Sequence, residues 1–229
     1  MQLNGIYYEK RAGKGRQLVL IHGLAGSTKS FDKLKLTNKM MLIDLRGHGK
    51  SSQPHDKKAY EMEQVIDDVR QIIKKEKLKD FTFIGFSLGG YVALRLLDEF
   101  PGAEAIMINP MMTRRNVRVS FVLKALISLF VPRRLIRRVV KQGYHGLINA
   151  YGKMLLNTPR HVYWALLKNF KGISDIKTKK KFTLIKSDHD EILNYEMLGN
   201  YELINIRGHH YVMAENPLDL LKILVKRIR

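Results

Sequence analysis

A serine lies between two glycines at a spacing that suits nucleophilic catalysis. The segment Gly85-Phe86-Ser87-Leu88-Gly89-Gly90 follows an apolar run that predicts a strand and opens a segment that predicts a helix. A strand-to-helix turn this tight forces the serine into a strained backbone conformation and raises its hydroxyl above the sheet. Side chains at Gly85 or Gly89 would collide with the neighbouring strand or helix. We therefore predict that Ser87 is a nucleophile at a helix N-terminus, where the helix dipole favours developing negative charge.

Acidic and histidine residues follow the serine in an order that suits this chemistry. Glycine and serine are common, so the turn alone is also compatible with an ordinary loop. Asp188 and Asp190 follow one later predicted strand, and His209 and His210 follow the next. An imidazole can take the serine proton, and a carboxylate can hold that imidazole in the correct tautomer. The sequence therefore holds candidates for every part of a Ser-His-Asp triad.

Short apolar runs alternate with amphipathic segments through most of the chain. Runs such as Leu18-Val19-Leu20-Ile21 are apolar throughout, which is typical of strands buried on both faces of a parallel sheet. Between the runs, apolar residues recur at three- and four-residue spacing, which predicts helices. The pattern predicts an α/β fold with a doubly wound, mainly parallel sheet. The expected strands are 18–21, 40–43, 81–84, 105–108, 182–185 and 203–206, and the expected helices are 61–76, 88–100 and 217–228.

The alternation stops after Pro110 and resumes close to residue 177. We predict a core built from residues 1–110 and 177–229, with residues 111–176 inserted as a basic helical lid. Residues 117–131 are apolar on most faces, which is expected of a lid that covers the Ser87 cleft. An apolar lid favours an acyl or otherwise hydrophobic substrate.

Positive charge is concentrated in this insertion. The formal net charge is +20, and residues 111–180 hold 16 Lys or Arg against one acid, Asp175. Such a concentration indicates that the segment faces something anionic, and residues 132–141 predict an amphipathic basic helix. The basic face is solvated, lies on anionic lipid, or docks an acidic carrier protein or coenzyme A. Nucleic-acid binding is not expected, because no recognition motif accompanies the charge.

The composition removes several chemistries. The chain has no cysteine, which excludes disulfides, cysteine-ligated zinc, iron–sulfur clusters and thiol nucleophiles. His22, His48 and His55 suggest a metal site only weakly, because the first two lie in loops that have another explanation. We expect no metal and no cofactor. The N-terminus lacks a signal-peptide pattern and no apolar run reaches 18 residues, so we expect a cytoplasmic protein without a transmembrane segment.

Five segments together resemble the α/β-hydrolase family. They are His22-Gly23 after an early strand, Asp44 to Ser52, the Ser87 turn, Ser187 to Asp190, and Gly208 to Pro217. The resemblance covers the chain outside the insertion and implies cleavage of an acyl C–O, C–S or C–C bond without a cofactor. It also implies that the segment beginning at Asp44 is an ordered turn and that the acidic residue there is not a base.

The family pattern implies which carboxylate acts as the acid. It places an aspartate three residues after a glycine-like position and shortly before an apolar pair, which favours Asp190 over Asp188. Ser187 stands where glycine is usual, so the shape of this loop departs from the pattern. Asn109 occupies the strand end where some relatives place the acid, but an amide cannot stabilise an imidazolium.

The histidine is chosen by the same resemblance. The family usually has glutamate five residues and proline seven residues beyond the catalytic histidine, and Glu215 and Pro217 lie at those distances from His210. Gly208 directly precedes His209, which matches the Gly-His pair of the family. We take His210 as the base, and His209 remains the alternative.

These roles imply a mechanism and a function. His210 takes the Ser87 proton, the backbone N–H groups of Leu24 and Leu88 hold the oxyanion, and water hydrolyses the acyl enzyme. The expected activity is that of a serine carboxylesterase acting on a small or medium apolar acyl ester. The alternatives are a thioesterase or acyl-carrier esterase, a C–C hydrolase or lyase with the same triad, and a receptor-like binder with residual hydrolase activity.

Overall fold

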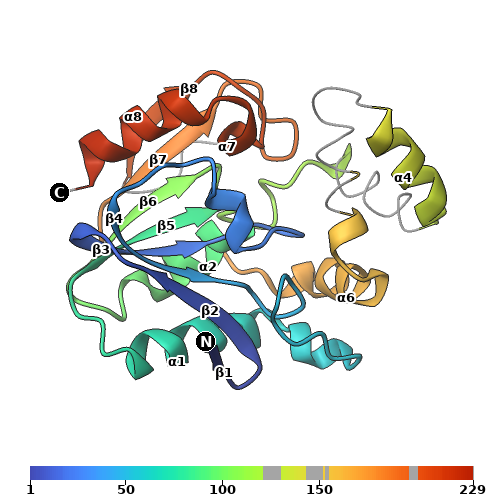
Figure 1. The fold of residues 1–229 in the computed structure, drawn as a ribbon, viewed down its shortest axis with the longest axis horizontal. Coiled ribbons are helices and arrows are strands. Elements are labelled where there is room, and N and C mark those ends of the chain that lie inside the picture. Colours follow the sequence, from blue (N-terminus) through green and yellow to red (C-terminus); the bar gives the residue numbers. More distant parts are fainter. Residues whose placement is uncertain (121–129, 143–151, 153–154, 196–200, 229) are drawn as a thin grey trace.

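A mainly parallel sheet with helices on both faces forms the centre of the molecule (Figure 1). The computed structural model describes residues 1–120, 130–142, 152, 155–195 and 201–228. Within these residues, the sheet has eight strands in the order β1-β2-β4-β3-β5-β6-β7-β8, and every pair from β4 to β8 is parallel. The doubly wound fold is therefore confirmed. The strands are β1 (Gln2–Leu3), β2 (Ile6–Arg11), β3 (Lys14–Ile21), β4 (Asn38–Ile43), β5 (Phe81–Phe86), β6 (Ala103–Ile108), β7 (Phe182–Ser187) and β8 (Tyr201–Ile206).

The first two strands were not among the sequence-based expectations. β2 pairs antiparallel with β4, so that Tyr8 lies opposite Ile43, and β1 folds back antiparallel on β2. Asn4 and Gly5 join them with φ angles of 50° and 79°. An Asn-Gly pair with positive φ is the typical signal of a tight hairpin. That signal was present in the sequence, next to runs too polar to resemble the buried strands.

Two hydrophobic layers hold the helices against the sheet. Successive side chains of a strand point to opposite faces, so Val19 and Ile21 pack in the layer with α1 and α2, whereas Leu18 and Leu20 pack in the layer with α7 and α8. α1 buries an apolar stripe at helical spacing, as expected. The helices are η1 (Thr28–Phe31), η2 (Lys57–Tyr60), α1 (Met62–Lys75), α2 (Leu88–Leu97), α4 (Arg133–Lys141), α6 (Arg160–Asn169), η3 (Phe170–Gly172), α7 (Val212–Glu215) and α8 (Pro217–Arg227).

The segment between β6 and β7 carries α4 and α6 beyond the carboxyl ends of the strands (Figure 1). α4 matches the basic helix expected at 132–141, while most of the apolar stretch at 117–131 lies outside the described residues. The N–H of Ile176 donates to the carbonyl of Met112 at 3.1 Å, so the two ends of the segment meet. The division into core and lid stays a prediction. No helix in the described residues is long and apolar enough to cross a membrane.

Candidate active site

Ser87 sits in the turn between β5 and α2 with a strained backbone. Its φ and ψ are 52° and −115°, a conformation that a residue with a side chain rarely adopts. Its N–H donates to the carbonyl of Ile108 at 3.1 Å, and its carbonyl accepts from Met111 N–H at 3.0 Å. The strain is therefore held by the neighbouring strand end, and the half-buried side chain borders a cavity above the sheet.

Glycines around the serine allow its turn to pack. A Cβ at Gly89 would lie 2.1 Å from the carbonyl oxygen of Ile21, and one at Gly85 would lie 2.6 Å from the Cα of Gly90. The expected collisions with strand and helix are thus present at both glycines. A Cβ at Gly23 would lie 2.9 Å from the Cβ of Ser87, so the loop after β3 also needs a glycine to approach the serine.

His210 and Asp190 form a buried pair at the ends of β8 and β7. Nδ1 of His210 lies 2.8 Å from Oδ2 of Asp190, and their side chains are 1% and 2% exposed. The other oxygen of Asp190 accepts the N–H groups of Ile192 at 2.9 Å and Leu193 at 2.8 Å. This arrangement fixes Nδ1–H as the donor to the carboxylate, which leaves Nε2 of His210 as the basic nitrogen.

The imidazole of His210 and the serine line one small cavity. Apolar side chains from several parts of the chain form its walls, among them those of Met111, Phe170 and Leu193. The ring of His210 packs 5.0 Å, centroid to centroid, from the ring of Phe86. The structure thus brings Ser87, His210 and Asp190 to one site, each from the carboxyl end of a different strand.

The two alternative residues lie elsewhere. His209 is exposed, and its Nδ1 lies 3.1 Å from Oε2 of Glu215, which also accepts the His209 N–H at 3.0 Å. Asp188 accepts the N–H of Gly208 at 2.9 Å, and this hydrogen bond lowers its pKa. Both residues shape the loop before α7. The sequence pattern used Glu215 to identify His210 as the base, but in the structure Glu215 contacts the preceding residue, His209.

Leu24 and Leu88, the two residues expected to supply oxyanion donors, lie beside Ser87. Leu88 is the first residue of α2, and Leu24 follows the glycine that packs against Ser87. In the described part of the chain, neither backbone N–H has an intramolecular acceptor. Both residues border the cavity that contains Ser87. Two free N–H donors beside a serine hydroxyl have the arrangement that stabilises a tetrahedral oxyanion.

Two buried neutral histidines brace the loop that carries Leu24. Nδ1–H of His22 donates to the Gly23 carbonyl at 2.7 Å, and Nε2 accepts the Leu45 N–H at 2.9 Å. His48 donates likewise to the Arg46 carbonyl and accepts from Ala25 N–H, both at 2.9 Å. Burial lowers the pKa of His22 to about 4, and burial together with His22 lowers the pKa of His48 to about 3.

These hydrogen bonds leave no ring nitrogen of His22 or His48 for a metal ion. The third histidine considered for a metal site, His55, stacks on His161 with ring centroids 4.2 Å apart. Among the described residues, no group of three or more His, Asp or Glu side chains is arranged to hold a metal. His22 and His48 therefore have a structural role.

Asp44 orders the turn that follows β4. Its carboxylate is 1% exposed and accepts the N–H of Thr28 at 2.6 Å and of Lys50 at 2.8 Å. Gly49 has a φ of 53°, and a Cβ there would lie 2.1 Å from Oδ2 of Asp44. The carboxylate is therefore enclosed by backbone, consistent with a structural role and not with that of a base.

Sequence reasoning missed Asn109 and Ser187 as parts of the site. Asn109 is fully buried, and its amide Nδ2 donates to Ser187 Oγ at 2.8 Å and to the His210 carbonyl at 2.9 Å. Its Oδ1 accepts the Ser187 N–H at 2.8 Å. The replacement of the usual glycine by Ser187 was the available signal, because a buried hydroxyl needs a hydrogen-bond partner.

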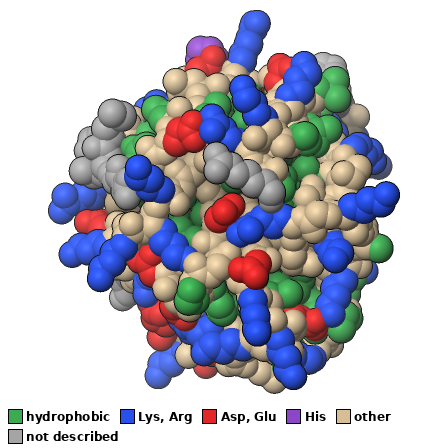
Figure 2. All heavy atoms as spheres, turned by 90° about the vertical axis from the view of Figure 1, so that its left-hand side faces the viewer, with side chains coloured by type: hydrophobic (Ala, Val, Ile, Leu, Met, Phe, Trp, Pro, Cys, Tyr) green, Lys and Arg blue, Asp and Glu red, His purple; other side chains and the backbone are tan. Residues whose placement is uncertain are grey.

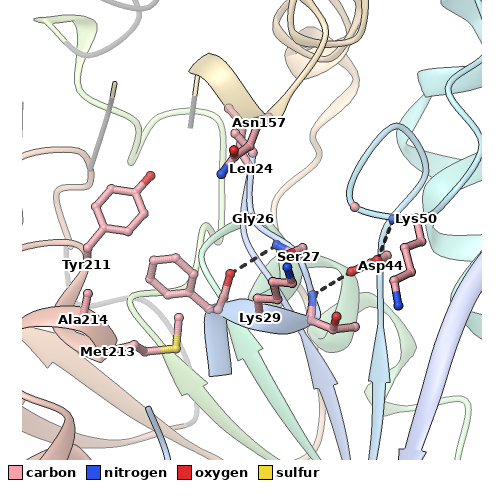
Figure 3. A pocket seen from close by; sticks show the side chains of 15 residues that line it. Leu24, Gly26, Ser27, Lys29, Asp44, Lys50, Asn157, Tyr211, Met213 and Ala214 are labelled. Carbon is pink, nitrogen blue, oxygen red and sulfur yellow. Dashed lines mark hydrogen bonds between the residues drawn. The ribbon is translucent and has the colours of Figure 1, made fainter. Parts of the chain in front are cut away.

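A larger pocket of about 530 Å³ adjoins the small cavity and shares Leu24, Phe86 and Tyr211 with it. In Figure 3, Tyr211 and Met213 line one side of it, and the loop after β3 with Lys29 lines the other. The pocket therefore lies between the loop that carries Leu24 and the loop that carries His210. A group leaving from a carbonyl near Ser87 has space there.

Comparison with known proteins supports what the geometry suggests. Residues 17–122 match the family model described as the alpha/beta hydrolase fold. The chain therefore has the α/β-hydrolase fold. Its sequence is similar to the AB hydrolase superfamily protein YisY of Bacillus subtilis, with 31% identity over 97 residues, 40% of this chain and 35% of that protein. The matches to the first curated relatives thus span about a third of their length.

Solved α/β-hydrolase structures superpose on almost the whole chain. An esterase from Exiguobacterium antarcticum has a TM-score of 0.77 and 18% identity, covering 97% of this chain and 95% of that one. A bromoperoxidase from Bacillus anthracis has a TM-score of 0.78 and 19% identity, with coverage of 96% and 94%. The N-acyl homoserine lactonase AidH has a TM-score of 0.77 and 17% identity, with coverage of 98% and 92%. At such identities the likeness establishes the shared fold.

Proposed function

We propose that this α/β hydrolase is a serine carboxylesterase that uses Ser87, His210 and Asp190. The observation that carries the proposal is the buried hydrogen bond between His210 Nδ1 and Asp190, with His210 on the same cavity as the strained Ser87. The esterases among the structural neighbours are in keeping with it.

The proposed mechanism assigns each proton. Nε2 of His210 takes the hydroxyl proton as Ser87 Oγ bonds to the substrate carbonyl carbon, and the N–H groups of Leu24 and Leu88 stabilise the oxyanion. The imidazolium, stabilised by Asp190, then protonates the departing alcohol. Water, deprotonated by the same nitrogen, releases the acid and restores the serine. Each oxyanion donor is typically worth about 3 kcal/mol of transition-state stabilisation.

The two cavities suit the two parts of an ester substrate, the acyl group and the alcohol. The walls around Ser87, including Met111 and Leu193, are apolar and enclose only about 20 Å³, so they suit a small apolar acyl group. The larger pocket lies beside the loop of the base, where the leaving group must receive its proton, so it suits the alcohol. A thiol leaving group would occupy the same position, which keeps a thioesterase as the enzymatic alternative, together with C–C cleavage.

A labelling and turnover experiment tests the esterase proposal. A fluorophosphonate should label the wild-type protein and leave Ser87→Ala unlabelled, and p-nitrophenyl esters of increasing acyl length should be hydrolysed until the cavity is filled. Labelling without turnover would favour the receptor-like binder over the esterase. Absence of labelling in the folded wild-type protein would refute Ser87 as the nucleophile.

We further propose that the basic face of α4 binds an anionic lipid surface. Arg134, Arg137 and Arg138 are exposed on this helix, Leu135 beside them is 50% exposed, and Phe130 just before the helix is 81% exposed. Cations next to exposed apolar side chains suit lipid headgroups and acyl chains together, whereas an acidic carrier protein needs only the cations. Figure 2 shows the side of the molecule away from α4, where basic and acidic side chains are mixed.

Vesicle cosedimentation tests this surface. Binding to phosphatidylserine vesicles should exceed binding to phosphatidylcholine vesicles, and it should weaken as salt rises. The triple variant Arg134→Glu, Arg137→Glu, Arg138→Glu should lose it, while the control Lys35→Glu, Lys39→Glu, Lys79→Glu, with the same change of charge elsewhere, should retain most of it. If both variants lose vesicle binding equally, the binding depends on net charge and not on α4, which would contradict the proposal. The absence of wild-type binding to either vesicle would also refute it.

A further inference from the structure

The segment that follows β6 touches both the nucleophile and the base. On one side, the Ile108 carbonyl accepts the Ser87 N–H at 3.1 Å, and the Met111 N–H donates to the Ser87 carbonyl at 3.0 Å. On the other side, the amide of Asn109 donates to the His210 carbonyl at 2.9 Å. Four consecutive residues, 108–111, therefore fix the backbone of the serine and of the histidine at once.

Asn109 is suited to this position by its backbone as well as its side chain. Its φ is 42°, a left-handed conformation that asparagine tolerates better than most residues with a side chain. Its N–H donates to the Ile185 carbonyl at 2.9 Å, which ties the residue to β7. Glycine would accept the same backbone but would lose the amide. Backbone geometry alone therefore does not account for asparagine at this site.

The side-chain amide is fully engaged in a buried network. Its oxygen accepts the Ser187 N–H, and its nitrogen donates to Ser187 Oγ and to the His210 carbonyl, with all three distances between 2.8 and 2.9 Å. Asn109 and Ser187 are both completely buried. In such surroundings an unmatched polar group is costly, so the network specifies one arrangement of the loop.

In the described part of the chain, two hydrogen bonds to side chains hold the backbone of His210. Its N–H donates to Oε2 of Glu191 at 3.1 Å, and its carbonyl accepts from Asn109. The hydrogen bond to Asp190 orients the ring about its own axis, but the position of the ring relative to Ser87 depends on where the backbone is held. Displacement of a catalytic group by about 1 Å can cost about 100-fold in rate.

We infer that Asn109, supported by Ser187, is a positioning residue that sets the distance between the base and the nucleophile. The inference rests on the proposed esterase function, since it assigns Asn109 a part in the same reaction. Asn109 touches neither the reacting atoms nor the ring of His210 in this role. It acts through the carbonyl of the histidine and through the strand end that holds the serine.

Three variants test this role. Asn109→Gly keeps a backbone that accepts positive φ and removes the amide, and we expect kcat to fall about 10- to 100-fold with KM unchanged. Ser187→Ala removes one of the amide's partners and should lower kcat only a few-fold, about 3-fold. Asn4→Gly is the matched control, because Asn4 also has positive φ (50°) and a side-chain hydrogen bond, on a distant turn. It should leave kcat and KM at the wild-type values.

The outcomes separate positioning from general stability. Wild-type kcat in Asn109→Gly, a change confined to KM, or an equal loss in Asn4→Gly would overturn the inference. If Asn109→Gly does not fold, Asn109→Asp replaces it. Aspartate keeps the acceptor for the Ser187 N–H but turns an oxygen toward the His210 carbonyl, so the same loss of kcat is expected, and wild-type kcat would overturn the inference.

A spectroscopic measurement keeps the inference separate from the esterase proposal. If the wild-type protein hydrolyses no ester, the proposed function fails, but the position of His210 can still be observed. The downfield proton NMR signal of His210 Nδ1–H, protected by Asp190, should be present in the wild type and in Asn4→Gly. It should shift or broaden in Asn109→Gly, and an unchanged signal there would overturn the inference.

Discussion

The loops on the two sides of Ser87 are fixed by different chemistry. The part of the loop after β3 that carries Leu24 is held by neutral imidazoles, since His22 and His48 each donate to a backbone carbonyl and accept a backbone N–H. The loops after β7 and β8 are held by carboxylates that accept backbone N–H groups, as Asp190 and Glu191 do. Neutral hydrogen-bonding groups suit a loop whose backbone N–H donors must stay unpaired. Negative charge suits a loop that must stabilise an imidazolium.

The largest effect should come from neutralising the carboxylate side. In Asp190→Asn the partner of His210 loses its charge and the wrong tautomer is favoured, so kcat/KM should fall about 10⁴-fold. Asp188→Asn is the matched control, because that exposed residue contacts Gly208 and not His210. It should change kcat/KM by less than about 3-fold. Similar losses in both variants would mean that the acid has been assigned incorrectly.

On the side of the imidazoles, in the turn that Asp44 orders, the largest effect should be on stability. Gly49→Ala places a methyl group 2.1 Å from Oδ2 of Asp44 at a φ of 53°, so the turn must distort. We expect a loss of about 3 kcal/mol in the free energy of unfolding, measured with urea. At Gly172 a Cβ meets nothing within 4 Å, so Gly172→Ala should be close to neutral. A neutral Gly49→Ala would contradict the tight packing around Asp44.

The burial of His22 and His48 should also make the stability of the protein depend on pH. The pKa values of His22 and His48 are lowered by burial to about 4 and about 3, so below pH 6.5 the unfolded chain binds protons that the folded chain does not. Stability is therefore complete above pH 6.5 and falls as the pH is lowered toward 4, by roughly 2 kcal/mol per ring at pH 5. Urea unfolding at pH 7.5, 6 and 5 measures the slope.

A variant isolates the contribution of one ring. His48→Gln removes a titrating group, so its stability should depend less steeply on pH between 6.5 and 5, even though the variant is less stable at pH 7.5. Slopes equal to those of the wild type would show that His48 is not held neutral by burial.

The smallest effect should be that of His209. Its exposed ring contacts Glu215 at the protein surface, and such contacts are typically worth about 0.5 kcal/mol. His209→Ala should keep kcat within about 3-fold of wild type, whereas His210→Ala should lose several orders of magnitude. Esterase assays on the two purified variants make this comparison, and a reversed order would reassign the base.

The sequence predicted those elements whose conformation is determined by residues close to one another in the chain. Buried parallel strands have apolar runs, α1 has a helical stripe, and the turn at Ser87 requires Gly85 and Gly89, so each could be inferred from neighbouring residues. β2 was missed because a strand near the sheet edge alternates with polar residues and gives a weaker signal.

The rest of the site depends on contacts between distant segments. Asn109 lies 78 residues before Ser187 and 101 before His210, and nothing in its neighbourhood indicates either partner. The same holds for the pairing of Ala25 N–H with His48. Residue types and order left Asp188 and His209 open as alternatives, and the family resemblance favoured Asp190 and His210. Only the fold brings these two side chains within 2.8 Å.

The hydrogen bond between Ile176 and Met112 joins the two ends of the segment between β6 and β7. Because the two ends of this segment meet, β6 and β7 would keep their register if the intervening chain were shortened, lengthened or exchanged for that of another protein. Since residue 111 is also tied to Ser87, such a graft would begin at a fixed point beside the nucleophile. For the esterase proposed above, we therefore expect that exchanging this segment would change substrate preference and leave the sheet intact.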